Sequence, residues 1–183
     1  MKTILPLLSL LLAGCVVPGQ ISTMKSTFDG STAVHSEPAW VYDGMLSSEI
    51  MLSLFRSSNM PSNEVVLTAS ASKNIADGPS LKFNINGEIV ALTSFDATSD
   101  ISTPPGMGVR CAKRYNTDLA FISRLIDATN VTVRLDLFRS YAEGRFSNDG
   151  PTMSRPAFRR FLAALDPSRA TNASPVVTKG THR

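Results

Sequence analysis

Side chains that commonly carry out acid–base and nucleophilic chemistry are scarce in this sequence. It contains two histidines, His35 and His182, and two cysteines, Cys15 and Cys111. Histidine is the commonest general base near neutral pH, and the Gly-x-Ser-x-Gly turn of many serine hydrolases does not occur in the sequence. A zinc site needs three or four Cys, His or carboxylate ligands at close spacing. The sequence therefore predicts no metal and no cofactor, and it favours a protein that is not an enzyme.

Cys111 and a few carboxylates remain as candidates for catalysis. Basic residues on both sides of Cys111 would favour a reactive thiolate if its side chain were exposed. The alternative is a buried thiol that packs as a small apolar group. The carboxylates near predicted strand ends are Asp96, Asp100 and Glu143, which are either solvated loop charges or an acid–base pair. A hydrolase that uses carboxylates or Cys111 is therefore kept as an alternative.

Two groups of residues are candidates for a ligand or partner surface. Trp40 and Tyr42 have rings that could stack on a sugar, although core packing or a sheet edge also explains them. Arg155 and Arg159, with Arg160, lie on one side of a predicted helix, where they either bind an acidic partner or form the solvated face. The formal net charge of +3 is too small to indicate nucleic acid as a partner.

The first fifteen residues have the pattern of an export signal. Lys2 supplies a positive charge, and the apolar run from Ile4 to Leu12 is much shorter than the roughly 20 residues that a membrane-spanning helix needs. The run ends in Leu12-Ala13-Gly14-Cys15, which resembles the lipobox of bacterial lipoproteins. The resemblance implies cleavage between Gly14 and Cys15, attachment of diacylglycerol to the Cys15 sulfur, and acylation of the new amino terminus.

This resemblance also implies a location in the cell and a class of function. The residue after Cys15 is Val16 rather than aspartate, which in that family favours the outer membrane, facing the periplasm. Lipidation of Cys15 would leave Cys111 without an intramolecular disulfide partner. The expected function is a membrane-anchored, non-enzymatic binding or scaffolding module, whose partners are the lipid bilayer and another envelope protein or the cell wall. The alternatives are a cell-envelope hydrolase and a carrier of an apolar ligand.

The chain divides into four predicted parts. They are a signal peptide at 1–14, the lipidated cysteine and a flexible tether at 15–26, one globular domain at 27–166, and a disordered tail at 167–183. Ten extended residues from Val16 to Lys25 reach at most about 35 Å. The domain is therefore expected to stay close to the membrane surface.

Alternating apolar residues predict the strands of this domain. The Asn86-Gly87 pair predicts a two-residue type I′ hairpin, in which Ile85 faces Glu88 and the large apolar side chains share one face. Residues 131–137 alternate clearly and predict a half-buried strand, which 141–146 continue or pair with. Residues 96–112 are rich in Pro, Gly, Ser and Thr and are expected to form a long connection.

Two amphipathic helices complete the predicted fold. Residues 117–128 place Ile122 and Ile126 on one stripe, and a second helix begins near Pro156 and ends before Pro167. The predicted order of elements is several strands, a helix, further strands and a second helix. This order lacks the regular alternation of strand and helix found in a parallel α/β sheet. The expected class is α+β, with an antiparallel sheet and two amphipathic helices packed on one face or end.

Overall fold

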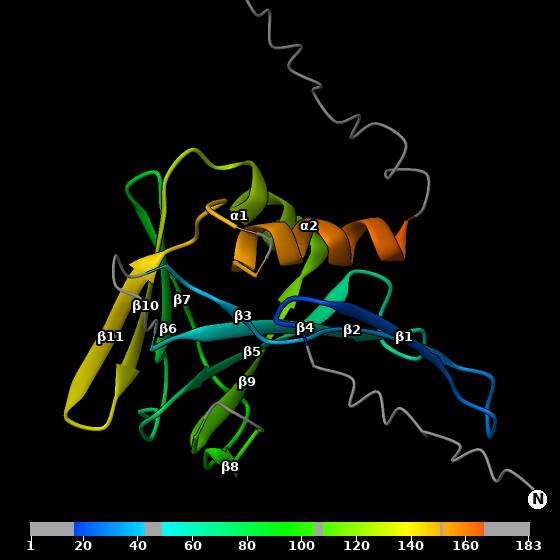
Figure 1. The fold of residues 1–183 in the computed structure, drawn as a ribbon, viewed down its shortest axis with the longest axis horizontal. Helices are drawn as coiled ribbons and strands as arrows, with labels where there is room; N and C mark the ends of the chain where they lie inside the picture. The colour runs from blue at the N-terminus through cyan, green and yellow to red at the C-terminus, as the bar shows by residue number, and fades with distance from the viewer. Residues whose placement is uncertain (1–16, 43–48, 105–107, 151, 167–183) are drawn as a thin grey trace, which may run out of the picture.

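The structure is a computed structural model that describes residues 17–42, 49–104, 108–150 and 152–166. The predicted signal peptide, Cys15 and the predicted tail lie outside these residues. The described chain is rich in strands and contains two helices (Figure 1). The elements are β1 (Ile21–Lys25), β2 (Thr32–Ser36), β3 (Ala39–Trp40), β4 (Met51–Ser57), β5 (Glu64–Ala71), β6 (Leu81–Ile85), β7 (Glu88–Leu92), β8 (Asp100–Ser102), β9 (Arg110–Asp118), α1 (Leu119–Asp127), β10 (Val131–Leu137), β11 (Ser140–Arg145) and α2 (Ser154–Leu165).

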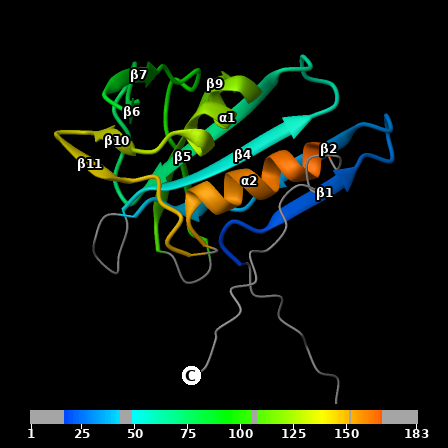
Figure 2. The same ribbon diagram turned by 90° about the horizontal axis from the view of Figure 1, so that it is seen from above.

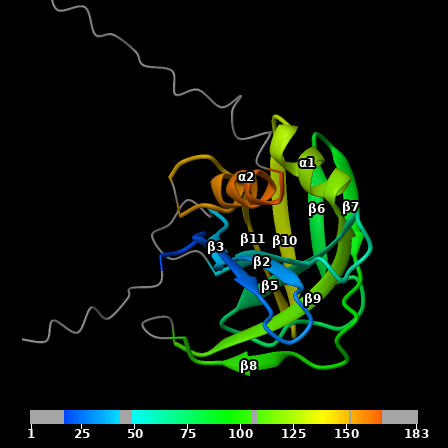
Figure 3. The same ribbon diagram turned by 90° about the vertical axis from the view of Figure 1, so that its right-hand side faces the viewer.

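The strands form two antiparallel sheets. A seven-stranded sheet has the order β1-β2-β4-β5-β9-β8, with β3 also paired to β4, and a four-stranded sheet has the order β11-β10-β6-β7. Single bridges join the two sheets, including one between Tyr42 and Arg145. The sheets curl toward each other into a half-barrel, seen in Figure 3. This confirms the α+β class at the level of an antiparallel sheet structure with two helices.

The hairpin and the alternating strand have the predicted register. Ile85 pairs with Glu88 and Phe83 with Val90, while Asn86 has the positive φ of 53° that the tight turn requires. β10 covers the predicted residues 131–137 and pairs with β6 on one side and β11 on the other. Residues 140–145 therefore pair with the strand rather than continue it.

Strand β9 corrects the prediction of a long connection at 96–112. The edge strand β8 lies within that range, and β9 begins at Arg110 and pairs with β5 on one side and β8 on the other. Its inward positions include Lys113 and Tyr115, which are 1% and 0% exposed. A buried lysine in an inward position hides the alternation of apolar and polar residues that reveals a strand.

Strand β1 corrects the predicted extent of the tether. Residues 21–25 pair with β2, although the sequence places them in a flexible segment. The preceding turn is also fixed, because the carbonyl of Gly19 accepts hydrogen bonds from Arg160 at 2.8 and 3.3 Å. The folded body therefore begins well before residue 27.

Both helices contribute to the hydrophobic core. Asp118 caps α1 by accepting a hydrogen bond from the Phe121 amide at 2.7 Å. In α2, Phe158 and Phe161 are fully buried, and Phe158 meets Phe146 edge to face at 5.1 Å. Figures 1 and 2 show α2 lying across the strands β2 and β4. In the described part of the chain, neither helix is long and apolar enough to cross a membrane.

Candidate functional site

The structure brings the predicted aromatic residues close to the start of α2. The Trp40 amide donates to the Thr152 carbonyl at 3.0 Å, and Tyr42 exchanges two backbone hydrogen bonds with Arg145. Both rings are partly buried, and each has an arginine near its face: Arg110 lies 5.8 Å from the Trp40 ring centre and Arg145 lies 5.2 Å from that of Tyr42. Both residues therefore lie where the sheets meet the segment that leads into α2.

Arg155 is the main correction to the predicted helix surface. Its side chain was expected on the solvated face of α2, but the residue is only 8% exposed. The guanidinium lies 5.4 Å from the ring of Phe146, and its buried Nε has no hydrogen-bond partner. Burial and, to a smaller extent, the charge of Arg159 lower the Arg155 pKa. The helix pattern could not predict this burial, because the segment after β11 supplies the covering atoms.

Arg155 differs from the other buried arginines. Three arginines of the described chain have a buried Nε without a partner, namely Arg56, Arg110 and Arg155. Arg56 and Arg110 still donate from Nη2 to backbone carbonyls, at 2.8 and 2.9 Å. Within the described residues, Arg155 donates no hydrogen bond and forms no ion pair. The Nε of Arg155 is therefore a buried donor without a partner, while its two terminal nitrogens are not among the buried atoms and stay open to the solvent side.

A cavity of about 240 Å³ adjoins this side chain. Its lining residues are Thr129, Asn130, Val131, Arg145, Phe146, Ser147, Asn148, Asp149 and Arg155, and we call this cavity the basic pocket. Two arginines face one carboxylate in this lining, and the Asp149 carboxylate already accepts a hydrogen bond from Ser147. The exposed Arg159 donates to Asn148 at 3.0 Å and so holds one wall of the pocket.

The amino end of α2 lies next to the basic pocket, because Arg155 in its first turn lines the pocket. Met153 is the N-cap residue, and it provides no side-chain hydrogen bond to the first turn. The amino end of a helix carries a partial positive charge and unsatisfied N–H groups, which attract anions. The guanidinium groups of Arg145 and Arg155, with the side-chain amides of Asn130 and Asn148, are suited to bind a carboxylate or a phosphate. Sequence reasoning missed Arg145 and Asn148 because their strand and loop positions carry no motif.

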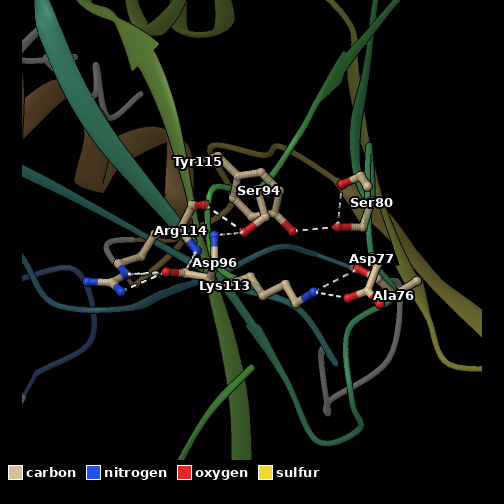
Figure 4. Close-up of polar contacts among 9 residues, drawn as sticks. Ala76, Asp77, Ser80, Ser94, Asp96, Lys113, Arg114 and Tyr115 are labelled. Carbon is tan, nitrogen blue, oxygen red and sulfur yellow. Dashed lines mark hydrogen bonds and ion pairs between the residues drawn. The ribbon is translucent and has the colours of Figure 1, made fainter. Parts of the chain in front are cut away.

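A second polar cluster lies between β9 and the segment before β6 (Figure 4). The Lys113 ammonium group lies 2.6 Å from the Asp77 carboxylate and 3.3 Å from the Ala76 carbonyl. The Lys113 side chain is 1% exposed, whereas that of Asp77 is 88% exposed. The hydroxyl groups of Tyr115 and Ser80 lie 2.9 Å apart. These contacts join β9 of the larger sheet to the segment that enters β6 of the smaller sheet.

Two titrating groups in this region, Asp96 and Tyr115, have pKa values moved away from neutral pH. Hydrogen bonds from Arg114 lower the Asp96 pKa below its usual value, with contacts as short as 2.6 Å. Burial raises the Tyr115 pKa to about 12. A general acid or base needs a pKa near the working pH. The cluster therefore has the chemistry of a structural network rather than of a proton-transfer site.

The Cys111 thiol is buried and hydrogen-bonded. It is 4% exposed, and its thiol lies 3.2 Å from Asn74 Oδ1, to which it donates. A buried thiol with a protein partner matches the packing interpretation and disfavours a solvent-accessible nucleophile. Among the described residues, no three His, Cys, Asp or Glu side chains lie close enough together to bind a metal ion.

Comparison with known proteins identifies no relative. No protein-family model, curated protein or solved structure matches this chain. The function is therefore inferred from the chain's own groups. The basic pocket is the strongest candidate site, because the Arg155 Nε beside it is buried and has no described hydrogen-bond partner.

Proposed function

We propose that this chain is a lipid-anchored envelope protein whose folded body is a non-enzymatic binding module. In this proposal Cys15 is lipidated, the protein lies on the outer membrane facing the periplasm, and the basic pocket binds an anionic group of another envelope component. The Leu12-Ala13-Gly14-Cys15 sequence supports the anchor. In this proposal the two helices pack their apolar sides on one end of the sheets, and α2 places the Arg155 side chain at the pocket.

The observation that carries the binding function is the buried Arg155 Nε that has no hydrogen-bond partner. A buried donor without a hydrogen-bond partner costs about 1–3 kcal/mol, because the group loses its hydration. Arg155 is 8% exposed and lies beside an open cavity that is lined by a second arginine. A bound carboxylate or phosphate would supply the missing acceptors, and charge-assisted hydrogen bonds of this kind are the strong ones.

The two alternative functions have weaker support. A hydrolase would need an accessible nucleophile or a carboxylate that can exchange protons, but Cys111 is buried and Asp96 is paired with Arg114. A carrier of an apolar ligand would need an apolar cavity, whereas the basic pocket is lined mainly by polar and charged residues. Binding of an anionic group is the function that the described site favours.

The anchor predicts a clear result for a Cys15→Ala variant. The wild-type chain expressed in a bacterium should incorporate labelled fatty acid and sediment with membranes. Each buried methylene of an acyl chain stabilises membrane association by about 0.8 kcal/mol. Cys15→Ala should lose the label. A Cys111→Ala variant, which removes the buried cysteine instead, is the matched control and should keep it. Equal labelling of Cys15→Ala and wild type would contradict the proposed anchor.

The basic pocket predicts stabilisation by inorganic phosphate. Phosphate should raise the melting temperature of the wild-type protein above that in chloride at the same ionic strength, because a ligand that binds the folded state stabilises it. Arg155→Gln should abolish the phosphate-dependent difference, measured within each variant by circular dichroism. Arg139→Gln removes an arginine from the turn between β10 and β11, at the end of the hairpin away from the pocket, and should keep the difference. An undiminished phosphate effect in Arg155→Gln would contradict the assigned site.

A further inference from the structure

We infer that the basic pocket binds the phosphate of a phospholipid headgroup in the same membrane that holds the anchor. This inference rests on the proposed function, since it needs both a lipidated Cys15 and an anion-binding pocket. It places the α2 side of the domain against the bilayer. The first argument comes from the path of the chain between the anchor and the folded body.

The start of the described chain is packed against α2. A turn closes between Val17 and Gln20 through a backbone hydrogen bond of 3.0 Å. Within this turn, Gly19 accepts hydrogen bonds from Arg160, and a Cβ atom at Gly19 would lie 2.9 Å from the Cβ of Ala157. Figures 2 and 3 show the chain entering β1 beside α2 and the segment that leads into α2. The amino-terminal end of the body therefore lies next to the helix that carries Arg155.

The remaining link to the anchor is very short. Cys15 precedes Val17 by two residues, which can span at most about 7 Å. A lipidated Cys15 would thus hold the bilayer surface within about this distance of the turn at Val17, in place of the 35 Å that a free tether would allow. Val17 is itself apolar and 52% exposed. The α2 side is therefore the side that the anchor would bring to the lipid.

The charges on this side complement a phospholipid headgroup. Arg155 and Arg160 are five residues apart on α2, which places them on opposite flanks of the helix, about 140° apart around its axis, and Arg159 is exposed between them. Arg145 joins Arg155 in the pocket. Guanidinium groups bind phosphate through paired hydrogen bonds, and a volume of about 240 Å³ suits a phosphate with a few attached atoms. An acidic protein could meet the same arginines, but the anchor would bring the outward side of α2 to the lipid first.

Trp40 allows a direct test in the intact lipoprotein. It is the only tryptophan of the chain, and its carbonyl accepts a hydrogen bond of 2.8 Å from Ser154 at the start of α2. The full-length lipidated protein would be reconstituted into phosphatidylcholine vesicles with or without phosphatidylglycerol. Both would contain a lipid with a nitroxide on its headgroup, which quenches nearby tryptophan fluorescence. We expect quenching that is stronger with phosphatidylglycerol, because basic residues near an anionic surface are attracted to it.

Variants separate the headgroup from other ligands. Arg155→Gln/Arg159→Gln should reduce the quenching in phosphatidylglycerol vesicles by about twofold or more, whereas Arg139→Gln should match wild type. Unchanged quenching in the double variant, or none in wild type, would overturn the headgroup inference. If phosphate still stabilised the wild-type protein, the pocket would then belong to a soluble anion or an acidic protein. Loss of the phosphate effect or of fatty-acid labelling would instead refute the proposed function itself.

Discussion

Replacing Asp77 by alanine is expected to destabilise the fold more than removing the buried lysine with which it pairs. Asp77→Ala should lower the free energy of unfolding by about 1–3 kcal/mol, because it leaves the buried ammonium group of Lys113 with one remaining protein acceptor, the Ala76 carbonyl, while water can enter the exposed place of the carboxylate. Lys113→Met replaces the charge with an apolar group of similar volume. It should stay within about 1 kcal/mol of wild type, or exceed it, because the cost of burying a charge disappears.

Urea unfolding of four proteins tests this expectation. Of these proteins, only Asp77→Ala should be destabilised. Wild type, Lys113→Met and the double variant should have similar stability, because without Lys113 there is no buried charge that needs the Asp77 carboxylate. A surface ion pair would behave differently, because its loss typically changes stability by less than about 1 kcal/mol. Asp77→Ala with wild-type stability would therefore show that water reaches Lys113 and that the pair is a surface one.

Gly144→Ala is the second substitution with a large expected effect. A Cβ atom at this position would lie 2.7 Å from the Tyr42 carbonyl oxygen and 2.8 Å from Val41 Cγ1. This backbone carbonyl accepts a hydrogen bond from the Arg145 amide. It therefore cannot move without breaking the bridge between the sheets. Overpacking of this kind costs about 1–3 kcal/mol. We expect a loss near the upper end, measured as a lower urea midpoint with an unchanged slope.

Gly150→Ala is the matched control for this substitution. Gly150 lies in the segment that leads to α2, and a Cβ there meets no atom within 4 Å. The added methyl group should leave stability unchanged or raise it slightly, because it restricts the unfolded chain. If Gly144→Ala were equally harmless, the close approach between β11 and the segment at Val41 and Tyr42 would have to be looser than the structure shows.

The parts of the fold that the sequence predicts are those in which local chemistry and tertiary environment agree. The Asn86-Gly87 turn needs positive φ, and the strands beside it alternate because one face is buried and the other is not. β10 alternates for the same reason. Gly144 lies in a strand that pairs regularly with β10, and glycine is required there by the nearby backbone of Tyr42 rather than by a turn.

The parts that the sequence does not predict depend on contacts between distant segments. β9 was missed because Lys113 occupies an inward position, where its charge is accepted by Asp77 and Ala76. Arg155 was predicted to be exposed, but Phe146 and its neighbours cover it. Of the candidate site, the sequence supplied Arg155 and Arg159 and missed Arg145. A helical or strand period describes one element, and it contains no information about which other segment will cover it.

The contact between Gly19 and Arg160 also bears on the timing of export. These residues are 141 positions apart in the sequence. If the chain crosses the membrane as it is synthesised, at about 5–20 residues per second, α2 follows the amino-terminal turn by on the order of ten seconds. During that interval the turn has no helix to bind. The proposed processing at Cys15 would thus be completed on an open chain, and arrival of α2 would then draw the acylated end against the body.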